Sequence, residues 1–272
     1  MIRLVCEKAQ TLKQFTDTHC AQASFYFTTL LKNKEIKVNG KKTGEDIALV
    51  EGDEICYYLT PKQEQKTAYT LVYEDENVLI IDKESGVNSE AVFADLSRKF
   101  DGECFFIHRL DRNTAGLMAF AKNAKTEAQL LTAFKEKRVE KRYHALCFGA
   151  MPKQADVMVA YLKKNEKTSL VKIYDTPVNG AEKIVTEYKV IEKFAETCKL
   201  EITLHTGKTH QLRAHLAHVG TPIVGDMKYG VTALNKSKNA NRQQLVAKHL
   251  SFDFTGDLAY LNEKRFTSKF DV

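Results

Sequence analysis

A single carboxylate lies between two arginines in the stretch HRLDRNTAGL, which runs from His108 to Leu117. Asp111 has Arg109 and Arg112 close by on either side, and the small residues Thr114, Ala115 and Gly116 that follow are expected to form a turn that presents Asp111. Two interpretations fit this pattern. One is a surface turn whose charges are solvated. The other is an ionised nucleophile or base held beside groups that bind something anionic, because a nearby positive charge favours the charged form of a carboxyl group.

A second candidate set lies in the stretch THQLRAHLAH, which begins at Thr209. His210 and Arg213 stand three residues apart and would share one face of a helix. Arg213 is then either a surface arginine or a partner for a carboxylate across a cleft. His210 and His215 are five residues apart, which leaves them about 140° apart around a helix and makes them a poor metal-binding pair. No metal site is predicted here, which weighs against a metal-dependent hydrolase.

The remaining sequence excludes several other classes of protein. Neither GxxxxGK[ST] nor GxGxxG occurs, and GxSxG is missing, so no nucleotide cofactor and no serine-hydrolase triad are predicted. The six cysteines are scattered without a CxxC pair, which is typical of reduced thiols in a cytoplasmic protein. Charges interrupt every apolar stretch, so neither a signal peptide nor a membrane span is expected. The net charge of +6 is compatible with a nucleic-acid partner.

These residues must be positioned by a mixture of strands and helices. Alternation of Leu200, Ile202 and Leu204 with polar residues predicts a strand with one buried face. Leu212, Leu216 and Val219 predict the buried face of a helix that Gly220 and Pro222 end. Strands are expected on either side of an acidic turn within 69–83, then at 141–149, 183–191 and 199–205, and helices at 126–134 and about 209–219. Hairpin-like strands with inserted helices favour an α+β fold with a largely antiparallel sheet.

The first sixty residues form a separate compact unit. A helix is expected from Ser24, as its N-cap, to Leu31, followed by a strand into an Asn39-Gly40 turn, a further turn at Gly52-Asp53 and a closing strand. Several lysines crowd this region: Lys32, Lys34, Lys37, Lys41 and Lys42. The polar, proline-containing stretch that follows predicts a linker. The expected organisation is thus residues 1–60, a linker at 61–67 and a second domain at 68–272.

Four ordered motifs together resemble the RluA-type RNA pseudouridine synthases. They are VYEDENVLIIDKESG, HRLDRNTAGLMAFAKN, KRYHALCFG and LHTGKTHQLRAHLAHVGTPIVGDMKYG, at 72–86, 108–123, 141–149 and 204–230. The similarity covers about residues 69–250. The helix, lysine-rich turn, VNGK and EGD of residues 10–59 resemble the S4 RNA-binding domain, but its helix reads SFYFTTLL without the arginines usual there. This degenerate S4-like domain either binds RNA or serves only for packing.

The resemblance implies the pseudouridine synthase fold and a role for each matching residue. Asp111 would be the catalytic carboxylate, acting on uridine so that the base detaches, rotates and rejoins through carbon, either by attack on C1′ or by removal of the 2′ proton. Arg213 would pair with Asp111. Tyr143 would lie against the target base, and Arg109 would fill the gap that the everted uridine leaves. RNA contacts are expected from Arg109, Arg112, Lys208 and His210.

Three departures from the family pattern leave these catalytic positions unchanged. Ala115 stands where serine is usual, Lys208 where arginine is usual, and Glu84 where proline is common. Lysine at 208 keeps the charge but loses bidentate phosphate geometry. The expected protein is a cofactor-free, monomeric, cytoplasmic isomerase of structured RNA, with large-subunit ribosomal RNA favoured over tRNA. The alternative is a non-catalytic RNA-binding or ribosome-assembly factor that retains the fold.

Overall fold

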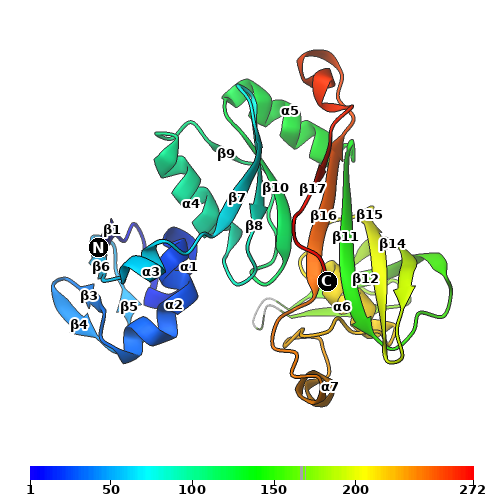
Figure 1. Ribbon diagram of the computed structural model, residues 1–272, viewed down its shortest axis with the longest axis horizontal. Helices are drawn as coiled ribbons and strands as arrows, with labels where there is room; N and C mark the ends of the chain where they lie inside the picture. Colours follow the sequence, from blue (N-terminus) through cyan, green and yellow to red (C-terminus); the bar gives the residue numbers. More distant parts are fainter. Residues whose placement is uncertain (166–167, 169) are drawn as a thin grey trace. The chain divides into compact units, whose positions relative to one another are not determined.

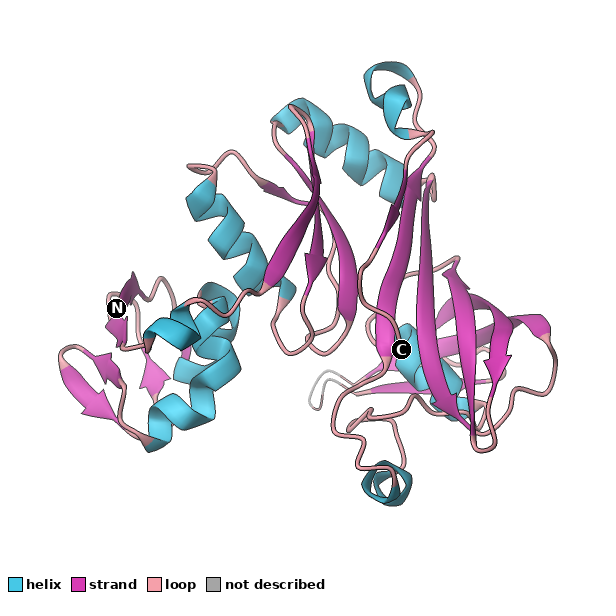
Figure 2. Cartoon of the chain, viewed as in Figure 1, coloured by secondary structure: helices cyan, strands magenta, loops and turns pink. Residues whose placement is uncertain are grey.

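The computed structural model describes residues 1–165, 168 and 170–272, and the chain divides into two compact units. The first comprises residues 1–112 and 118–128, and the second comprises 113–117 and 129–272. Figures 1 and 2 show the elements of both units. Within the described residues, no helix has the length and the apolar run needed to cross a membrane. The six cysteines are all buried free thiols.

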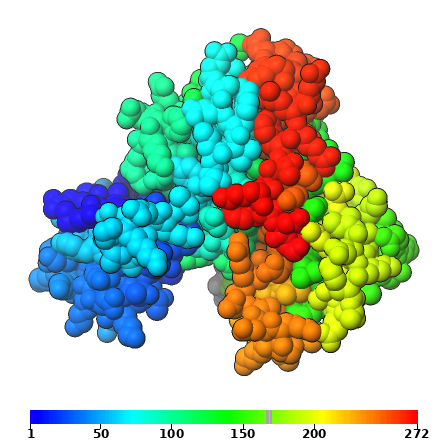
Figure 3. Space-filling model, in the orientation of Figure 1, coloured from blue at the N-terminus to red at the C-terminus, as the bar shows by residue number. Residues whose placement is uncertain are grey.

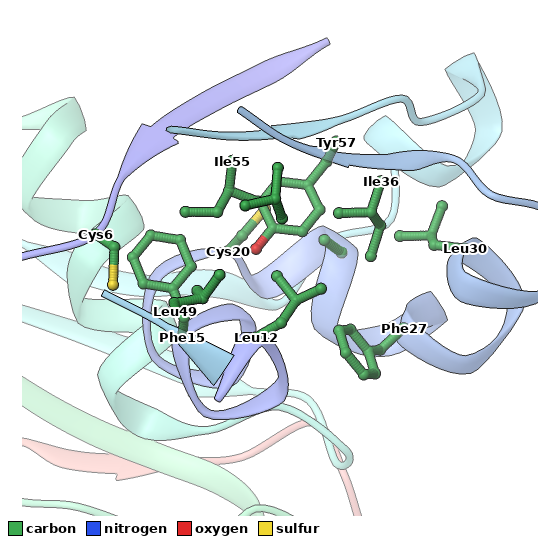
Figure 4. Close-up of a cluster of buried hydrophobic side chains, with 12 residues drawn as sticks. Cys6, Leu12, Phe15, Cys20, Phe27, Leu30, Ile36, Leu49, Ile55 and Tyr57 are labelled. Carbon is green, nitrogen blue, oxygen red and sulfur yellow. The ribbon is translucent and has the colours of Figure 1, made fainter. Parts of the chain in front are cut away.

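The N-terminal part of the first unit packs two helices against small antiparallel sheets. Its elements are β1 Ile2–Val5, β2 Gln10–Thr11, α1 Leu12–His19, α2 Ala21–Lys32, β3 Ile36–Val38, β4 Lys41–Thr43, β5 Ala48–Leu49, β6 Glu54–Tyr57 and α3 Pro61–Glu64. The strand orders are β1-β6-β3-β4 and β2-β5. Aromatic and aliphatic side chains fill the space between helices and strands (Figure 4), among them Phe15, Phe27, Ile36, Ile55 and Tyr57.

Local predictions in this region have mixed outcomes, and the turn at Asn39-Gly40 is confirmed. Asn39 and Gly40 both have positive φ, 49° and 77°, as the two-residue turn between β3 and β4 requires. The predicted helix start is wrong, because α2 begins at Ala21 with Cys20 as its N-cap. Ser24 is buried inside the helix, where its hydroxyl donates to Asp17 at 2.6 Å instead of capping. The stretch predicted as a linker contains the one-turn helix α3, with a capping box at Thr60.

The rest of the first unit is a small sheet with helical cover. Its elements are β7 Tyr69–Glu74, β8 Val78–Lys83, α4 Ser89–Lys99, β9 Phe105–Phe106, and the later part of β10, which spans Ala115–Ala121. The strand, acidic turn and strand expected within 69–83 are therefore confirmed. Every residue of β8 is buried, including Asp82 and Lys83. Helix α4 is absent from the sequence predictions, and it proves to position the candidate site.

The second unit is built on a long antiparallel sheet. Its elements are α5 Ala124–Lys135 (from Gln129 on), β11 Val139–Phe148, β12 Ala155–Lys164, β13 Val171–Tyr174, β14 Glu182–Lys193, β15 Thr197–Leu204, α6 Gln211–His218, α7 Thr232–Ser237, β16 Leu245–Phe252, the 3₁₀ helix η1 Gly256–Leu261 and β17 Arg265–Thr267. The strand order is β13-β12-β14-β15-β11-β16, and β17 pairs with β16. The predicted α+β class with a mainly antiparallel sheet is confirmed.

Strand β10 begins in the second unit, where it runs parallel to β16 through Ala115 and Gly116. The turn expected at Thr114, Ala115 and Gly116 is therefore misplaced: the turn lies at residues 112–113, and Ala115 and Gly116 belong to the strand. Gly116 has φ 116°, and a Cβ atom there would lie 2.4 Å from the carbonyl oxygen of Ala247. This glycine is required because the two backbones approach so closely.

We expect Gly116→Ala to lower the free energy of unfolding by about 2–3 kcal/mol, since the added methyl must displace backbone atoms and the φ value is unfavourable for alanine. Gly149→Ala is the matched control. Gly149 also has a positive φ, 78°, but a Cβ atom there meets its nearest neighbours at 4.0 Å. Urea unfolding of both variants measures the difference, and equal losses would contradict the steric explanation.

Candidate active site

The segment that carries Asp111 is fixed on both sides by buried hydrogen bonds. The Ser89 hydroxyl, in the first turn of α4, donates to the Leu110 carbonyl and accepts from the Leu110 N–H, both at 2.9 Å. The Arg112 carbonyl accepts from the Gly86 N–H at 2.8 Å and from Lys83 Nζ at 3.2 Å. Asp111 is half-buried between these two anchored residues. Hydrogen bonds to the backbone of both neighbours thus hold the segment at Asp111 in place.

Lys83 is fully buried beside this segment. Its ammonium also donates to the carbonyl oxygens of Glu84 and Val87, each at 2.9 Å. Burial lowers the pKa of Lys83 to about 7, although the Asp111 carboxylate acts in the opposite direction. The proton is therefore bound less tightly in the folded chain than in the unfolded chain, whose lysine titrates near 10.5.

The direction of this pKa shift predicts how the stability of the protein depends on pH. Between pH 7 and about 10.5 the unfolded state binds more protons at Lys83 than the folded state, so stability rises with pH in that window. We expect the stability of the unmodified chain relative to Lys83→Met to increase by a few kcal/mol, on the order of one per pH unit, between pH 7 and 10. Urea unfolding of both proteins at several pH values measures it, and parallel pH profiles would contradict the assignment.

The two arginines that flank Asp111 have different surroundings. Arg109 is exposed and forms an ion pair with Glu90 of α4, with 2.9 Å between Nη1 and Oε1. Arg112 is half-buried and reaches the N-terminal helices, where it pairs with Asp17 at 2.6 Å and donates to the Ser24 carbonyl at 3.3 Å. RNA binding through Arg112 would have to compete with these partners, whereas Arg109 stands at the surface.

Tyr143 lies on β11 and is buried. Its sheet neighbours are Ile202 on β15 and Ala247 on β16, and Ala247 in turn pairs with Gly116 on β10. The β11–β16 register shifts between Arg142 and Tyr143. Such an irregularity changes the direction of the strand, and with it the direction of the Tyr143 side chain. On the β16 side, the sheet neighbours of Tyr143 are therefore small residues, first Ala247 and then Gly116.

The side chain of Arg213 projects from the face of α6 that is opposite to β14. Gln211 and His215 fix the helix to β14: the Gln211 amide donates to the Val185 carbonyl at 3.2 Å, and His215 Nδ1 contacts the Thr186 hydroxyl at 3.0 Å. Because Arg213 is two residues from each, it points about 200° away from them. The predicted buried face is only partly right, since Leu212 and Leu216 are buried but Val219 is exposed.

The guanidinium of Arg213 forms a buried bidentate ion pair with Asp226. The Nε–Oδ2 distance is 2.7 Å and the Nη2–Oδ1 distance is 3.0 Å. Burial alone would raise the pKa of Asp226, but the hydrogen bonds and charge of Arg213 hold it below its usual range, helped by the Lys228 and Tyr229 N–H groups. The guanidinium carbon also lies 5.2 Å from the centre of the Tyr229 ring.

His210 precedes α6 as its N-cap residue, in a left-handed conformation with φ 54°. It is therefore not part of the helical face that the sequence predicted. Its Nδ1 lies 2.9 Å from the Tyr229 hydroxyl, so the same tyrosine joins His210 and Arg213. Lys208 is exposed and pairs with Glu182. Of the predicted residues, the structure thus links His210 and Arg213 through Tyr229.

Asp226 and Tyr229 are the residues that sequence reasoning missed. Both stand in the quoted GDMKYG stretch, so the motif contained them without revealing which arginine or histidine they contact. Ser89 and Lys83 were missed for a similar reason, since their partners at 110 and 112 are distant in sequence. These contacts hold the candidate residues rigidly, as a site that must act on one geometry requires.

Comparisons with known proteins point to one family. The family model for RNA pseudouridylate synthase matches residues 27–218. "Ribosomal large subunit pseudouridine synthase C" of Rickettsia bellii is 35% identical over 228 residues, covering 74% of this chain and 75% of the relative. The protein of that name from Vibrio vulnificus is 31% identical over 252 residues, covering 82% of this chain and 78% of the relative.

A solved structure extends the similarity to the fold. "Human RNA Pseudouridylate Synthase Domain Containing 1" superposes with a TM-score of 0.60 at 26% identity, covering 70% of this chain and 84% of that one. The match of the family model spans more than half of the chain, and the relatives cover about three quarters of it. On this evidence, the chain belongs to the RNA pseudouridylate synthase family.

Proposed function

We propose that this family member converts specific uridines to pseudouridine in large-subunit ribosomal RNA, with Asp111 as the catalytic carboxylate. The observation that carries the proposal is the anchoring of both neighbours of Asp111, which fixes a carboxylate in a rigid, half-buried segment. The ribosomal target rests on the relatives, which are named large-subunit enzymes. Cytoplasmic location and a monomeric state belong to the same proposal.

The reaction breaks the bond between N1 of uracil and C1′ of the ribose and forms a bond from C5 to C1′. The C5 proton is lost and N1 gains a proton, so the product is an isomer of uridine. Asp111 either attacks C1′ or removes the 2′ proton, and both routes need the ionised carboxylate. In this proposal Arg213 pairs with Asp111, as the family resemblance implies, and the bidentate ion pair with Asp226 fixes the orientation of the guanidinium. The Tyr143 ring stacks on the detached base and offers its hydroxyl for a proton step.

Access to uridine in a structured RNA requires the nucleotide to leave its stack, which costs a few kcal/mol. Arg109 is suited to offset part of this cost because its guanidinium is exposed and can stack or bind phosphate. Lys208 and His210 of the second unit are further candidates for RNA contacts, and Arg112 contributes charge from its position beside Asp17.

We also assign residues 1–60 to an S4-like RNA-binding module, joined by residues 61–67 to a catalytic domain at 68–272. A surface groove of about 390 Å³ in this module is lined by Lys32, Lys34 and Lys42. Its lysines can contact phosphates even though the helix SFYFTTLL lacks arginines. The groove favours an RNA-binding role over one in packing alone.

RNA affinity should fall steeply with salt, because phosphate contacts release counterions. We expect a loss of about a hundredfold or more between 50 and 300 mM salt. Replacing Lys32, Lys34 and Lys42 with glutamine should reduce the slope of log affinity against log salt by up to about 0.9 for each lysine that contacts a phosphate. Filter binding at five salt concentrations measures both, and equal affinity at 50 and 300 mM would contradict the proposed interface.

The proposed function is tested by mapping pseudouridine in cellular RNA with and without the gene for this chain. At least one uridine of the large-subunit RNA should remain unmodified without the gene, and adding the purified protein to that RNA should restore the modification. Loss of pseudouridine only from tRNA would contradict the proposed substrate. An unchanged map would contradict the enzymatic proposal.

A further inference from the structure

Two histidines and a glutamate gather on the polar face of β11, β15 and β16. His144, Glu201 and His249 each offer a donor atom, and these atoms all lie within 4.8 Å of one another. His144 pairs with Glu201 across β11 and β15, and His249 stands opposite Arg142. Because His144 follows Tyr143 in an extended strand, its side chain points to the opposite face of the sheet. The cluster is therefore separate from the proposed catalytic residues.

We propose that His144, Glu201 and His249 form a binding site for a divalent transition-metal ion, with Zn²⁺ as the best match. Two imidazoles and one carboxylate are ligands that zinc accepts, at about 2.0–2.2 Å each. His144 Nε2 and Glu201 Oε2 are 3.9 Å apart, so small side-chain rotations bring both within reach of one ion. The two imidazole rings lie at 86° to each other, with their centroids 5.8 Å apart.

Hydrogen bonds already orient both imidazole rings. His144 Nδ1 lies 2.9 Å from the Asp271 carboxylate, and His249 Nδ1 lies 3.0 Å from the Thr267 hydroxyl. These partners leave the Nε2 atoms as the ligand atoms, because one ring nitrogen binds the metal while the other is fixed by a neighbouring group. A carboxylate on the far side of a ligating histidine also raises its basicity. The arrangement is that of a metal site with its supporting groups in place.

The charges around the cluster are compatible with an added cation. Lys199 and Lys248 both pair with Asp271, at 2.9 and 3.6 Å, so both ammonium groups have a carboxylate partner outside the ligand set. Arg142 pairs with Glu140 at 2.7 Å as well as with Glu201 at 3.4 Å. Glu201 can therefore turn to a metal ion while Arg142 keeps its shorter ion pair.

The site is accessible from solvent, and an ion bound there would link several parts of the second unit. Glu201 lines a surface groove of about 520 Å³ together with Arg142 and His205, which leaves room for a water ligand. Asp271 belongs to the C-terminal segment, drawn in red at the surface in Figure 3. Lys248 Nζ also donates to the Ser268 and Phe270 carbonyls in this segment, at 2.9 and 2.7 Å. A bound ion would tie three strands and the chain end together.

Cobalt absorption on the tag-free full-length protein tests the site. After chelator treatment, titration with Co²⁺ should give a visible d–d absorption that saturates at one ion per chain and disappears when Zn²⁺ is added. His249→Asn and Glu201→Gln should each remove the absorption. His205→Asn is the matched control, because this exposed histidine pairs with Glu187 at 2.8 Å and lies outside the ligand set. It should keep the absorption.

Thermal unfolding provides an independent measurement. Zn²⁺ should raise the midpoint of the unmodified chain and of His205→Asn, since an ion that binds only the folded state stabilises it, and should leave Glu201→Gln unchanged. Glu201→Gln keeps the size of the side chain, so it decides the result if His249→Asn fails to fold. Absence of a saturating absorption, or an equal absorption in Glu201→Gln, would overturn the proposal. Pseudouridine formation is not used as a readout, so failure here leaves the proposed function standing.

Discussion

Asp111→Asn should abolish pseudouridine formation while leaving RNA binding nearly unchanged. Asparagine has the size of aspartate but can neither attack C1′ nor accept a proton as a base, so we expect turnover to fall by about 10⁴-fold or more. Affinity should change only a few-fold, because phosphate contacts elsewhere provide most of the binding. Single-turnover conversion of a ribosomal RNA fragment and filter binding on the same preparation measure the two effects.

Asp101→Asn is the control for this experiment. Asp101 is exposed and has a left-handed backbone, φ 49°, that asparagine tolerates, so the substitution removes one negative charge without strain. It should keep full activity. Turnover that survives in Asp111→Asn would refute the proposed carboxylate. If the unmodified chain binds ribosomal RNA tightly and converts no uridine in it, the result would support the alternative of a non-catalytic RNA-binding factor.

The second large effect concerns the ion pair between Arg213 and Asp226. Asp226→Asn removes the carboxylate that binds the buried guanidinium with two hydrogen bonds, so we expect a loss of about 3–5 kcal/mol in the free energy of unfolding. Turnover should also fall, by about a hundredfold, because Arg213 is no longer held in one orientation. Urea unfolding and single-turnover rates measure the two losses.

A double variant separates the structural role of the pair from its role in the reaction. Arg213→Met with Asp226→Leu removes both buried charges and fills the space with apolar side chains, which should restore much of the lost stability. Turnover should stay low, because Asp111 would have no guanidinium partner. Recovery of activity together with stability would show that the pair serves only the fold.

Local predictions from the sequence succeeded where a short pattern determined the structure. The Asn39-Gly40 turn is confirmed because both residues tolerate positive φ, and β15 is confirmed because Leu200 and Ile202 alternate with polar residues around them. The helix start at Ser24 was wrong because Asp17, seven residues away, accepts the Ser24 hydroxyl. Whether a serine caps a helix therefore depends on competing hydrogen-bond partners, and a short sequence pattern does not reveal these partners.

The missed parts of the candidate site have the same cause. Helix α4 had a local signal, since Asn88 precedes an amphipathic stretch with an acid in its first turn. The role of α4 in positioning the site had no local signal, because the contact between Ser89 and Leu110 exists only in the folded chain. Likewise the sequence presented Arg213 and Asp226 within one motif, but their pairing depends on the turn between α6 and Tyr229.

A crystal structure of the chain with a bound RNA stem-loop tests the pairing of Asp111 with Arg213 directly. We expect the carboxylate and the guanidinium within about 4 Å of each other, with the target uridine outside its helix stack and its base against Tyr143. The opposite result is an Asp111 side chain farther from Arg213 than one water molecule can bridge, beside a uridine that stays stacked. That result would contradict the proposed active site.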